Sequence, residues 1–144
     1  MEKVNFSTII HAPKEKVWSV LWDKDSYRKW TSVFAEGSDA ITDWNEGSKV
    51  LFVSGTGEGM VSRIESKRPN EFMRFEHIGV VKNNVEDTES DEVKQWAGAM
   101  EAYTLSEENG HTRLSVDMDI TADYKDYFLT TWPKALEQVK QLAE

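Results

Sequence analysis

The sequence predicts an α+β fold: a curved antiparallel sheet of about seven strands wrapped around a long, kinked C-terminal helix, with a short helix pair between strands one and two. Three observations support this expectation. A β-like run, Val4–Ile10, ends at Ala12-Pro13, and a helical pattern begins directly behind it. Much of residues 40–121 alternates between apolar and polar side chains, which is the period of a half-buried strand. From Asp123 onward, apolar residues recur at three and four positions, the period of a helix.

Residues that favour the first turn of a helix predict a pair of short helices after the first strand. Proline has a fixed φ and no N–H, so Pro13 closes the first strand and suits the first position of a helix that runs to about Leu21. Asp23 or Asp25 can then cap a second, short helix that ends near Trp30. We therefore expect two short helices before the second strand.

Six further strands are expected before the C-terminal helix. They are separated by residues that favour turns, and Asn109-Gly110 is the strongest hairpin signal. In residues 114–120 every second side chain is apolar, which is typical of a sheet with one buried and one wet face. The expected strands are Ala40–Trp44, Val50–Ser54, Gly59–Ser66, Phe72–Val81, Trp96–Glu107 and Thr112–Thr121.

The segment from Asp123 to Glu144 should cover the apolar face of this sheet. Pro133 removes one backbone hydrogen bond, so it predicts either a kink near residues 129–132 or two helical pieces that meet there. The apolar stripe of the segment comprises Tyr124, Phe128, Trp132, Ala135, Leu136, Val139 and Leu142.

Composition limits the partners. A length of 144 residues suits a single domain, residues 1–144. The net charge is −9, from 26 acidic and 17 basic residues, and no strong basic cluster is present, which argues against nucleic acid and anionic membranes as partners. There is no cysteine, no signal-peptide pattern and no apolar run of membrane-spanning length. We therefore expect no membrane insertion and a cytoplasmic location.

The acidic residues are concentrated in one place, with five of them in residues 86–92. This run lacks the Asp-x-Asp-x-Asp-Gly pattern of a calcium loop. The chain also has no His-x-Glu-x-x-His or comparable ligand spacing, so neither a metal nor a cofactor is expected. Mutual repulsion and low hydrophobicity predict a disordered, solvated loop from about Lys82 to Lys94.

Short motifs spread over nearly the whole chain carry a family resemblance. They are His11-Ala12-Pro13 with Val17-Trp18, Tyr27-Arg28-Lys29-Trp30, Trp44-Asn45-Glu46-Gly47-Ser48, Gly59-Met60-Val61 with Pro69, Gly110-His111-Thr112-Arg113-Leu114, and Trp132-Pro133-Lys134-Ala135-Leu136. In this order they resemble the START-like (SRPBCC) superfamily, whose helix-grip fold is birch-pollen-allergen-like. The branch they resemble most is that of the activator of the ninety-kilodalton heat-shock-protein ATPase. The resemblance implies the fold, but its members range from lipid carriers to cyclases and chaperone co-factors.

Aromatic and methionine side chains supply a candidate ligand pocket. The chain has six Trp, six Phe and four Tyr. For any one of them, ordinary core packing is the simpler interpretation, but around a concave sheet they together favour an apolar pocket with few polar anchors. The candidate ligand-binding residues are Trp30, Phe34, Phe52, Met73, Phe75, His77, Met100, Tyr103, Met118, Phe128 and Trp132.

His77 is the one histidine on an expected inward face, so it could act as a base or orient a polar ligand group. Because no carboxylate partner lies nearby in the sequence, a hydrogen-bonded core histidine is the favoured interpretation. Tyr103 and Thr104 are further candidate anchors. Glu101 shares the face of Tyr103 if that strand has no bulge.

Three classes of function fit these features. The favoured one is binding, without catalysis, of a small, mostly hydrophobic molecule with one polar or carboxylate end. The second is a protein-interaction module, similar to a chaperone ATPase activator, that would dock a protein partner through the acidic loop. The third is a cyclase- or dehydratase-type enzyme acting in the same cavity. It is the least favoured, because the sequence offers only His77 and Glu101 and no convincing dyad, and no catalytic residue is assigned.

Overall fold

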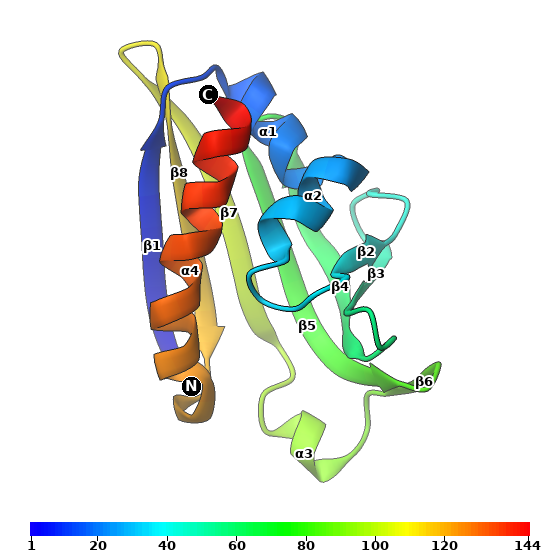
Figure 1. Ribbon diagram of the computed structural model, residues 1–144. Helices are drawn as coiled ribbons and strands as arrows, with labels where there is room; N and C mark the ends of the chain where they lie inside the picture. The colour runs from blue at the N-terminus through cyan, green and yellow to red at the C-terminus, as the bar shows by residue number, and fades with distance from the viewer.

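A curved antiparallel sheet holds a long C-terminal helix on its concave side (Figure 1). This computed structural model describes residues 1–144, and it confirms the expected α+β helix-grip architecture. The strands are β1 (Glu2–Ile10), β2 (Asp39–Ile41), β3 (Lys49–Val53), β4 (Gly59–Arg68), β5 (Phe72–Lys82), β6 (Val85–Asp87), β7 (Ala99–Glu108) and β8 (His111–Ile120). The helices are α1 (Lys14–Trp22), α2 (Lys24–Thr31), α3 (Asp91–Lys94) and α4 (Ala122–Ala143).

The strand order is β1-β8-β7-β5-β4-β3-β2, with β6 paired to β5, and every pairing is antiparallel. β1 pairs along its whole length with β8, from Glu2 opposite Ile120 to Ile10 opposite Thr112. The first strand of the chain therefore lies beside the last. Because α4 follows β8 directly, it starts at this side of the sheet and runs back over the concave face (Figure 1).

The core lies between the concave face and the helices. α4 packs against β1, α1 and α2, so the helix pair and the long helix form one layer over the sheet. The inward positions of β8 are buried and alternate with more exposed ones, as the sequence pattern predicts. The largest fully buried side chains include Ile10, Leu21, Ile64, Met73, Phe75 and Leu114.

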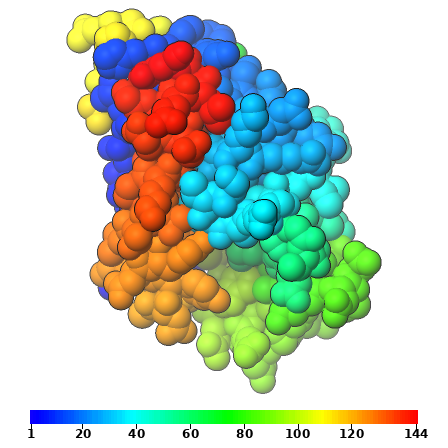
Figure 2. All heavy atoms as spheres, in the orientation of Figure 1, coloured from blue at the N-terminus to red at the C-terminus, as the bar shows by residue number.

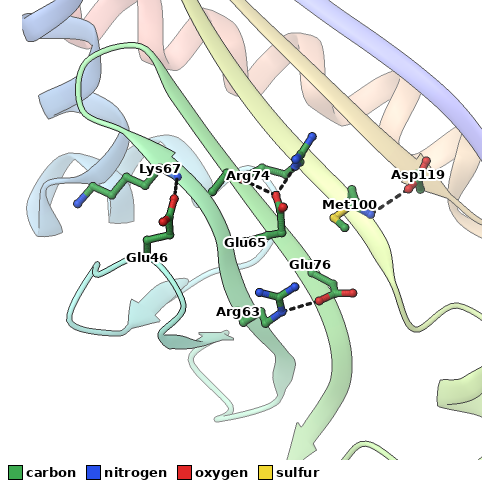
Figure 3. Close-up of polar contacts among 9 residues, drawn as sticks. Glu46, Arg63, Glu65, Lys67, Arg74, Glu76, Met100 and Asp119 are labelled. Atoms are coloured by element: carbon green, nitrogen blue, oxygen red, sulfur yellow. Dashed lines mark hydrogen bonds and ion pairs between the residues drawn. The ribbon is translucent and has the colours of Figure 1, made fainter.

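The convex face of the sheet is the wet face and carries charged pairs across strands (Figure 3). Arg63 Nε on β4 donates to Glu76 Oε1 on β5 at 2.6 Å. Arg74 on β5 pairs with Glu65 on β4. Such partly exposed pairs contribute little to stability, but they keep the convex face polar. The apolar surface of the sheet therefore lies on its concave face.

The acidic segment corrects one expectation. Residues 82–94 are not a disordered loop, because they contain β6 and α3. Asn83 and Asn84 have φ of +52° and +63°, the left-handed values of a tight hairpin turn, and they return the chain along β5 as β6. Asp87 Oδ1 then accepts the Ser90 amide at 3.0 Å, and the Ser90 hydroxyl caps α3. The strand β6 is the eighth strand, one more than the sequence suggested.

Element boundaries agree with the expected ones to within a few residues. β7 begins at Ala99 rather than Trp96, because the turns that follow α3 extend to Gly98, whose φ is +95°. α4 continues through Pro133 as one helix, so the alternative of two helical pieces is wrong. None of the helices is both long enough and apolar enough to cross a membrane.

Candidate functional site: a cavity beneath helix α4

A cavity of about 270 Å³ lies between the sheet and the first half of α4. Its walls come from α1, α2 and the segment after α2, from the β3–β4 hairpin, and from inward residues of β5, β7 and β8. In Figure 2 the surface is recessed where the first half of α4, in orange, meets the segment that follows α2, in cyan. Since 13 of its 21 lining residues are hydrophobic, the interior is mainly apolar.

Aromatic rings form most of the wall. Trp132, which is 3% exposed, meets Phe34 edge-on with ring centroids 5.0 Å apart and lies 6.1 Å from Trp30. On another side, Trp22 meets Tyr103 at 4.9 Å. The Nε1 atoms of Trp22 and Trp132 are closed to solvent and have no acceptor, so neither indole N–H serves as a ligand anchor in this conformation. This part of the wall is therefore aromatic and offers no indole N–H to a ligand.

Eight of the eleven expected ligand-binding residues line this cavity. They come from α2, the segment behind it, four different strands and α4, and the fold brings them together. These residues are Trp30, Phe34, Phe52, His77, Tyr103, Met118, Phe128 and Trp132.

Met73 and Phe75 face the same side but belong to the filled core. They are 1% and 0% exposed and do not line the cavity. The ring of Phe75 packs against Phe52 at 5.0 Å and against Trp22 at 5.5 Å. Phe75 therefore supports the wall from behind rather than forming it, and Met73 belongs to the same buried core.

The expectation for Met100 is wrong. Side chains alternate along β7, and Glu101 and Tyr103 face inward, so Met100 and Thr104 face the convex side. There the Met100 amide donates to Asp119 Oδ2 at 2.9 Å (Figure 3). Thr104 is likewise removed from the set of candidate anchors.

A connected chain of four polar side chains lies at the floor of the cavity, where three of them line it and Ser62 is buried beyond His77. Ser62 Oγ lies 2.6 Å from His77 Nδ1, and His77 Nε2 lies 3.2 Å from Glu101 Oε1. The Tyr103 hydroxyl donates to the other oxygen, Glu101 Oε2. With Glu101 ionised, its carboxylate can only accept, so Nε2 of His77 carries the hydrogen and Nδ1 accepts from Ser62. His77 therefore has the carboxylate partner that the local sequence did not reveal.

Sheet register assembles this chain. Ser62 is directly opposite His77, and a β-bulge between Val61 and Ser62 sets that pairing. On the other side of β5, Ala99 is opposite His77, which makes Glu101 a diagonal neighbour on the same face. Ser62 and His77 are 0% and 8% exposed, so their hydrogen bond is shielded from water.

Two further carboxylates line the cavity. Asp39 Oδ2 accepts from Arg28 at 3.0 Å. Partial burial acts to raise the pKa of Asp39, but the bonds from Arg28 and from the Ala40 amide outweigh it, so the pKa lies below its ordinary value. Glu58, in the β3–β4 hairpin, is exposed. No lysine or arginine lines the cavity, so its charged groups are acidic.

Two of the three tyrosines that line the cavity, Tyr27 and Tyr103, are buried and stay neutral well into alkaline solution. Burial is the main cause that raises the pKa of Tyr103, and the charge of Glu101 and the hydrogen bond to it add to the effect. Burial likewise raises the pKa of Tyr27, with smaller contributions from Glu101 and Asp39. Both phenols therefore stay uncharged, and that of Tyr103 donates a hydrogen bond to Glu101.

Sequence reasoning missed several lining residues. Trp22 and Tyr27 belong to the expected helix pair, and their aromatic character was a usable signal. Ser62, which does not line the cavity but bonds to His77, had no such signal, because its position depends on a bulge that strict alternation cannot indicate. Glu101 was recognised as a candidate, and the structure confirms that it shares the inward face of Tyr103.

Comparisons with known proteins agree with this architecture. The sequence profile described as "Activator of Hsp90 ATPase homolog 1-like protein" matches residues 11–144. The Aha1 dimer from Colwellia psychrerythraea has a similar structure, with TM-score 0.75 and 21% identity, over 100% of this chain and 97% of that chain. Protein MLL2253 from Mesorhizobium loti is similar with TM-score 0.74 and 16% identity, over 98% of this chain and 96% of that chain. CalU16 from Micromonospora echinospora is similar with TM-score 0.69 and 17% identity, over 99% of this chain and 76% of that chain.

At these identities the solved structures establish a common fold and nothing more. A search of curated proteins gave no match. The profile match nevertheless spans nearly the whole chain. The protein therefore belongs to the activator of Hsp90 ATPase homolog 1-like family, a branch of the START-like (SRPBCC) superfamily.

Proposed function

We propose that the protein binds a small, mostly hydrophobic molecule in the cavity beneath α4. The observation that carries this proposal is the contrast between an aromatic wall and one connected polar group, His77–Glu101–Tyr103, on the floor. Ligand pockets combine an apolar lining with a few convergent polar atoms in this way. Because the superfamily supports diverse activities, the proposal depends on the site rather than on the family.

Apolar burial would supply most of the affinity. A ligand that loses about 200 Å² of apolar surface gains roughly 5 kcal/mol at ~25 cal/mol per Å², before the costs of association. A simple one-ring probe should therefore bind no more tightly than about millimolar. The volume of about 270 Å³ suits a small ligand.

A neutral aromatic probe, phenethyl alcohol, tests this proposal by NMR titration. Shift changes should centre on the Trp30, Phe52 and Trp132 side chains that line the cavity. Met118→Ala, inside the cavity, should change the affinity, whereas Met100→Ala, on the convex face, should leave it unchanged. Shifts confined to the convex face or to residues 83–94 would count against the cavity and favour the protein-interaction alternative.

The His77–Glu101 pair favours one second candidate, a proton-transferring enzyme of the cyclase or dehydratase type. Glu101 faces the cavity as the group that would accept a proton from an acidic carbon, and His77 and Tyr103 hold its two oxygens. Solvent deuterium exchange into the methyl group of acetophenone, followed by NMR, tests this candidate. Wild type should accelerate the exchange and Glu101→Gln should not, while equal rates with and without protein would dismiss catalysis of this kind.

A further inference from the structure

Glu101 is a cavity carboxylate that has neither a lysine nor an arginine partner. Of the three carboxylates in the lining, Asp39 is paired with an arginine and Glu58 is exposed at the hairpin. The Glu101 side chain is only 17% exposed, and its hydrogen-bond partners are His77 and Tyr103. Because no lysine or arginine lines the cavity, the imidazole of His77 is the one basic side chain within hydrogen-bond reach of Glu101.

The Glu101 carboxylate can accept a further hydrogen bond from a ligand. An ionised carboxylate has about four lone-pair sites, and here one bond is made to each oxygen. The two bonds come from neighbouring rigid strands and fix the direction of the carboxylate. In the apolar surroundings of the cavity, an added charge-assisted hydrogen bond would be stronger than in water.

We propose that the ligand of this cavity carries a protonated amine on a small apolar body, with the amine bound by Glu101. The inference rests on the proposed function and narrows its ligand class. A protonated amine supplies the positive charge of a lysine or arginine partner, and the aromatic residues Phe52 and Tyr103, which also line the cavity, can attract a cation. A carboxylate-ended ligand would instead meet like charges with no lysine or arginine to offset them.

The size of the cavity and the raised pKa values of Tyr27 and Tyr103 also support a small amine as the ligand. About 270 Å³ suits a one-ring amine better than a long acyl chain. The negative charge of Glu101, added to the larger effect of burial, raises the pKa of both Tyr103 and Tyr27. Its field therefore reaches the walls on which the body of a ligand would lie.

Three probes with closely similar apolar bodies test the inference: phenethylamine, phenethyl alcohol and phenylpropionate, titrated near neutral pH and followed by NMR. In wild type, the amine should bind more tightly than the carboxylate by about tenfold or more, as one charge-assisted hydrogen bond allows. Glu101→Gln should bring the amine and carboxylate affinities to within about threefold of each other, and the affinity of the alcohol measures any general damage to the cavity. Glu58→Gln, at the exposed hairpin, is the matched control and should change the ratio by less than about twofold.

The outcomes separate the inference from the proposed function. If the alcohol binds in the cavity and the carboxylate binds as tightly as the amine, the ligand class is wrong and the hydrophobic-ligand proposal stands. If none of the three probes binds, both fail. A Glu101→Gln variant that does not fold leaves the wild-type ratio decisive, and an amine preference that Glu58→Gln abolishes would overturn the assignment to Glu101.

Discussion

His77 and Glu101 are 24 residues apart in the sequence, yet Nε2 of one lies 3.2 Å from Oε1 of the other. The strands that carry them, β5 and β7, are neighbours in the sheet, and their register sets Phe75 opposite Glu101. The two side chains are therefore diagonal neighbours on the concave face. The pair is a product of topology, since the acidic segment that separates the strands in sequence folds out of the way as β6 and α3.

The partner on the other side of the histidine should matter for stability. Ser62→Ala leaves Nδ1 of the buried His77 without its hydrogen bond, so it should lower the free energy of unfolding by about 1–2 kcal/mol. Ser66→Ala is the matched control, because Ser66 bonds to Glu65 on the more exposed face and its loss should cost under about 0.5 kcal/mol. Denaturant unfolding measures both, and equal effects would show that the buried bond contributes nothing.

Trp132 should be the most costly residue of α4 to truncate. Its ring is 3% exposed and packs against Phe6, Phe34 and Tyr103, but one side borders the cavity. Trp132→Ala should therefore lower the free energy of unfolding by about 3 kcal/mol, at the lower end of the usual range for such truncations. Met100→Ala, on the convex face, should cost under about 1 kcal/mol, and a similar loss in both variants would mean that the inward face has been misassigned.

Much of the fold could be predicted from the sequence because local patterns specify it. Alternation in residues 114–120 gave the correct buried face of β8, and Asn109-Gly110 forms the turn expected of it, with φ of +52° and +81°. The helical period placed Trp132 correctly on the buried side of α4. Residues whose contacts follow directly from one period were thus placed correctly.

The rest could not be predicted because it depends on register or on local turns. Met100 was expected to face inward, but Glu101 and Tyr103 are the inward residues of this strand. Two adjacent positions of one strand cannot share a face, so Met100 faces the other side. The Ser62–His77 bond depends on a bulge, which the apolar pattern does not encode. The disordered loop expected for residues 82–94 was inferred from their acidic charge and low hydrophobicity. That inference overlooked the turn at Asn83-Asn84, because asparagine favours positive φ.

Gly59, in the β3–β4 hairpin, should not tolerate a side chain. A Cβ atom there would lie 1.7 Å from the Phe52 carbonyl oxygen and 2.8 Å from the Val53 Cα atom, so the backbones of β3 and β4 would have to separate. Gly59→Ala should lower the free energy of unfolding by about 2 kcal/mol or more and weaken amide protection in β3. Thr56→Ala, at the exposed tip of the same hairpin, should be nearly neutral, and a neutral Gly59→Ala would contradict this packing.

Alkaline solution should destabilise the fold through Tyr27 and Tyr103, whose pKa values are both raised, mainly by burial. Unfolded tyrosines ionise near pH 10, so above about pH 10 the unfolded state releases protons that the folded state retains. The stabilising contribution is therefore complete below about pH 10, and it falls by up to roughly 1.4 kcal/mol per pH unit for each tyrosine as the pH rises further. Urea unfolding at several alkaline pH values should show a shallower decline for Tyr27→Phe and Tyr103→Phe than for wild type. Ultraviolet absorbance should show these two phenols ionising only as the protein unfolds, and their ionisation in the folded protein close to pH 10 would refute the assignment.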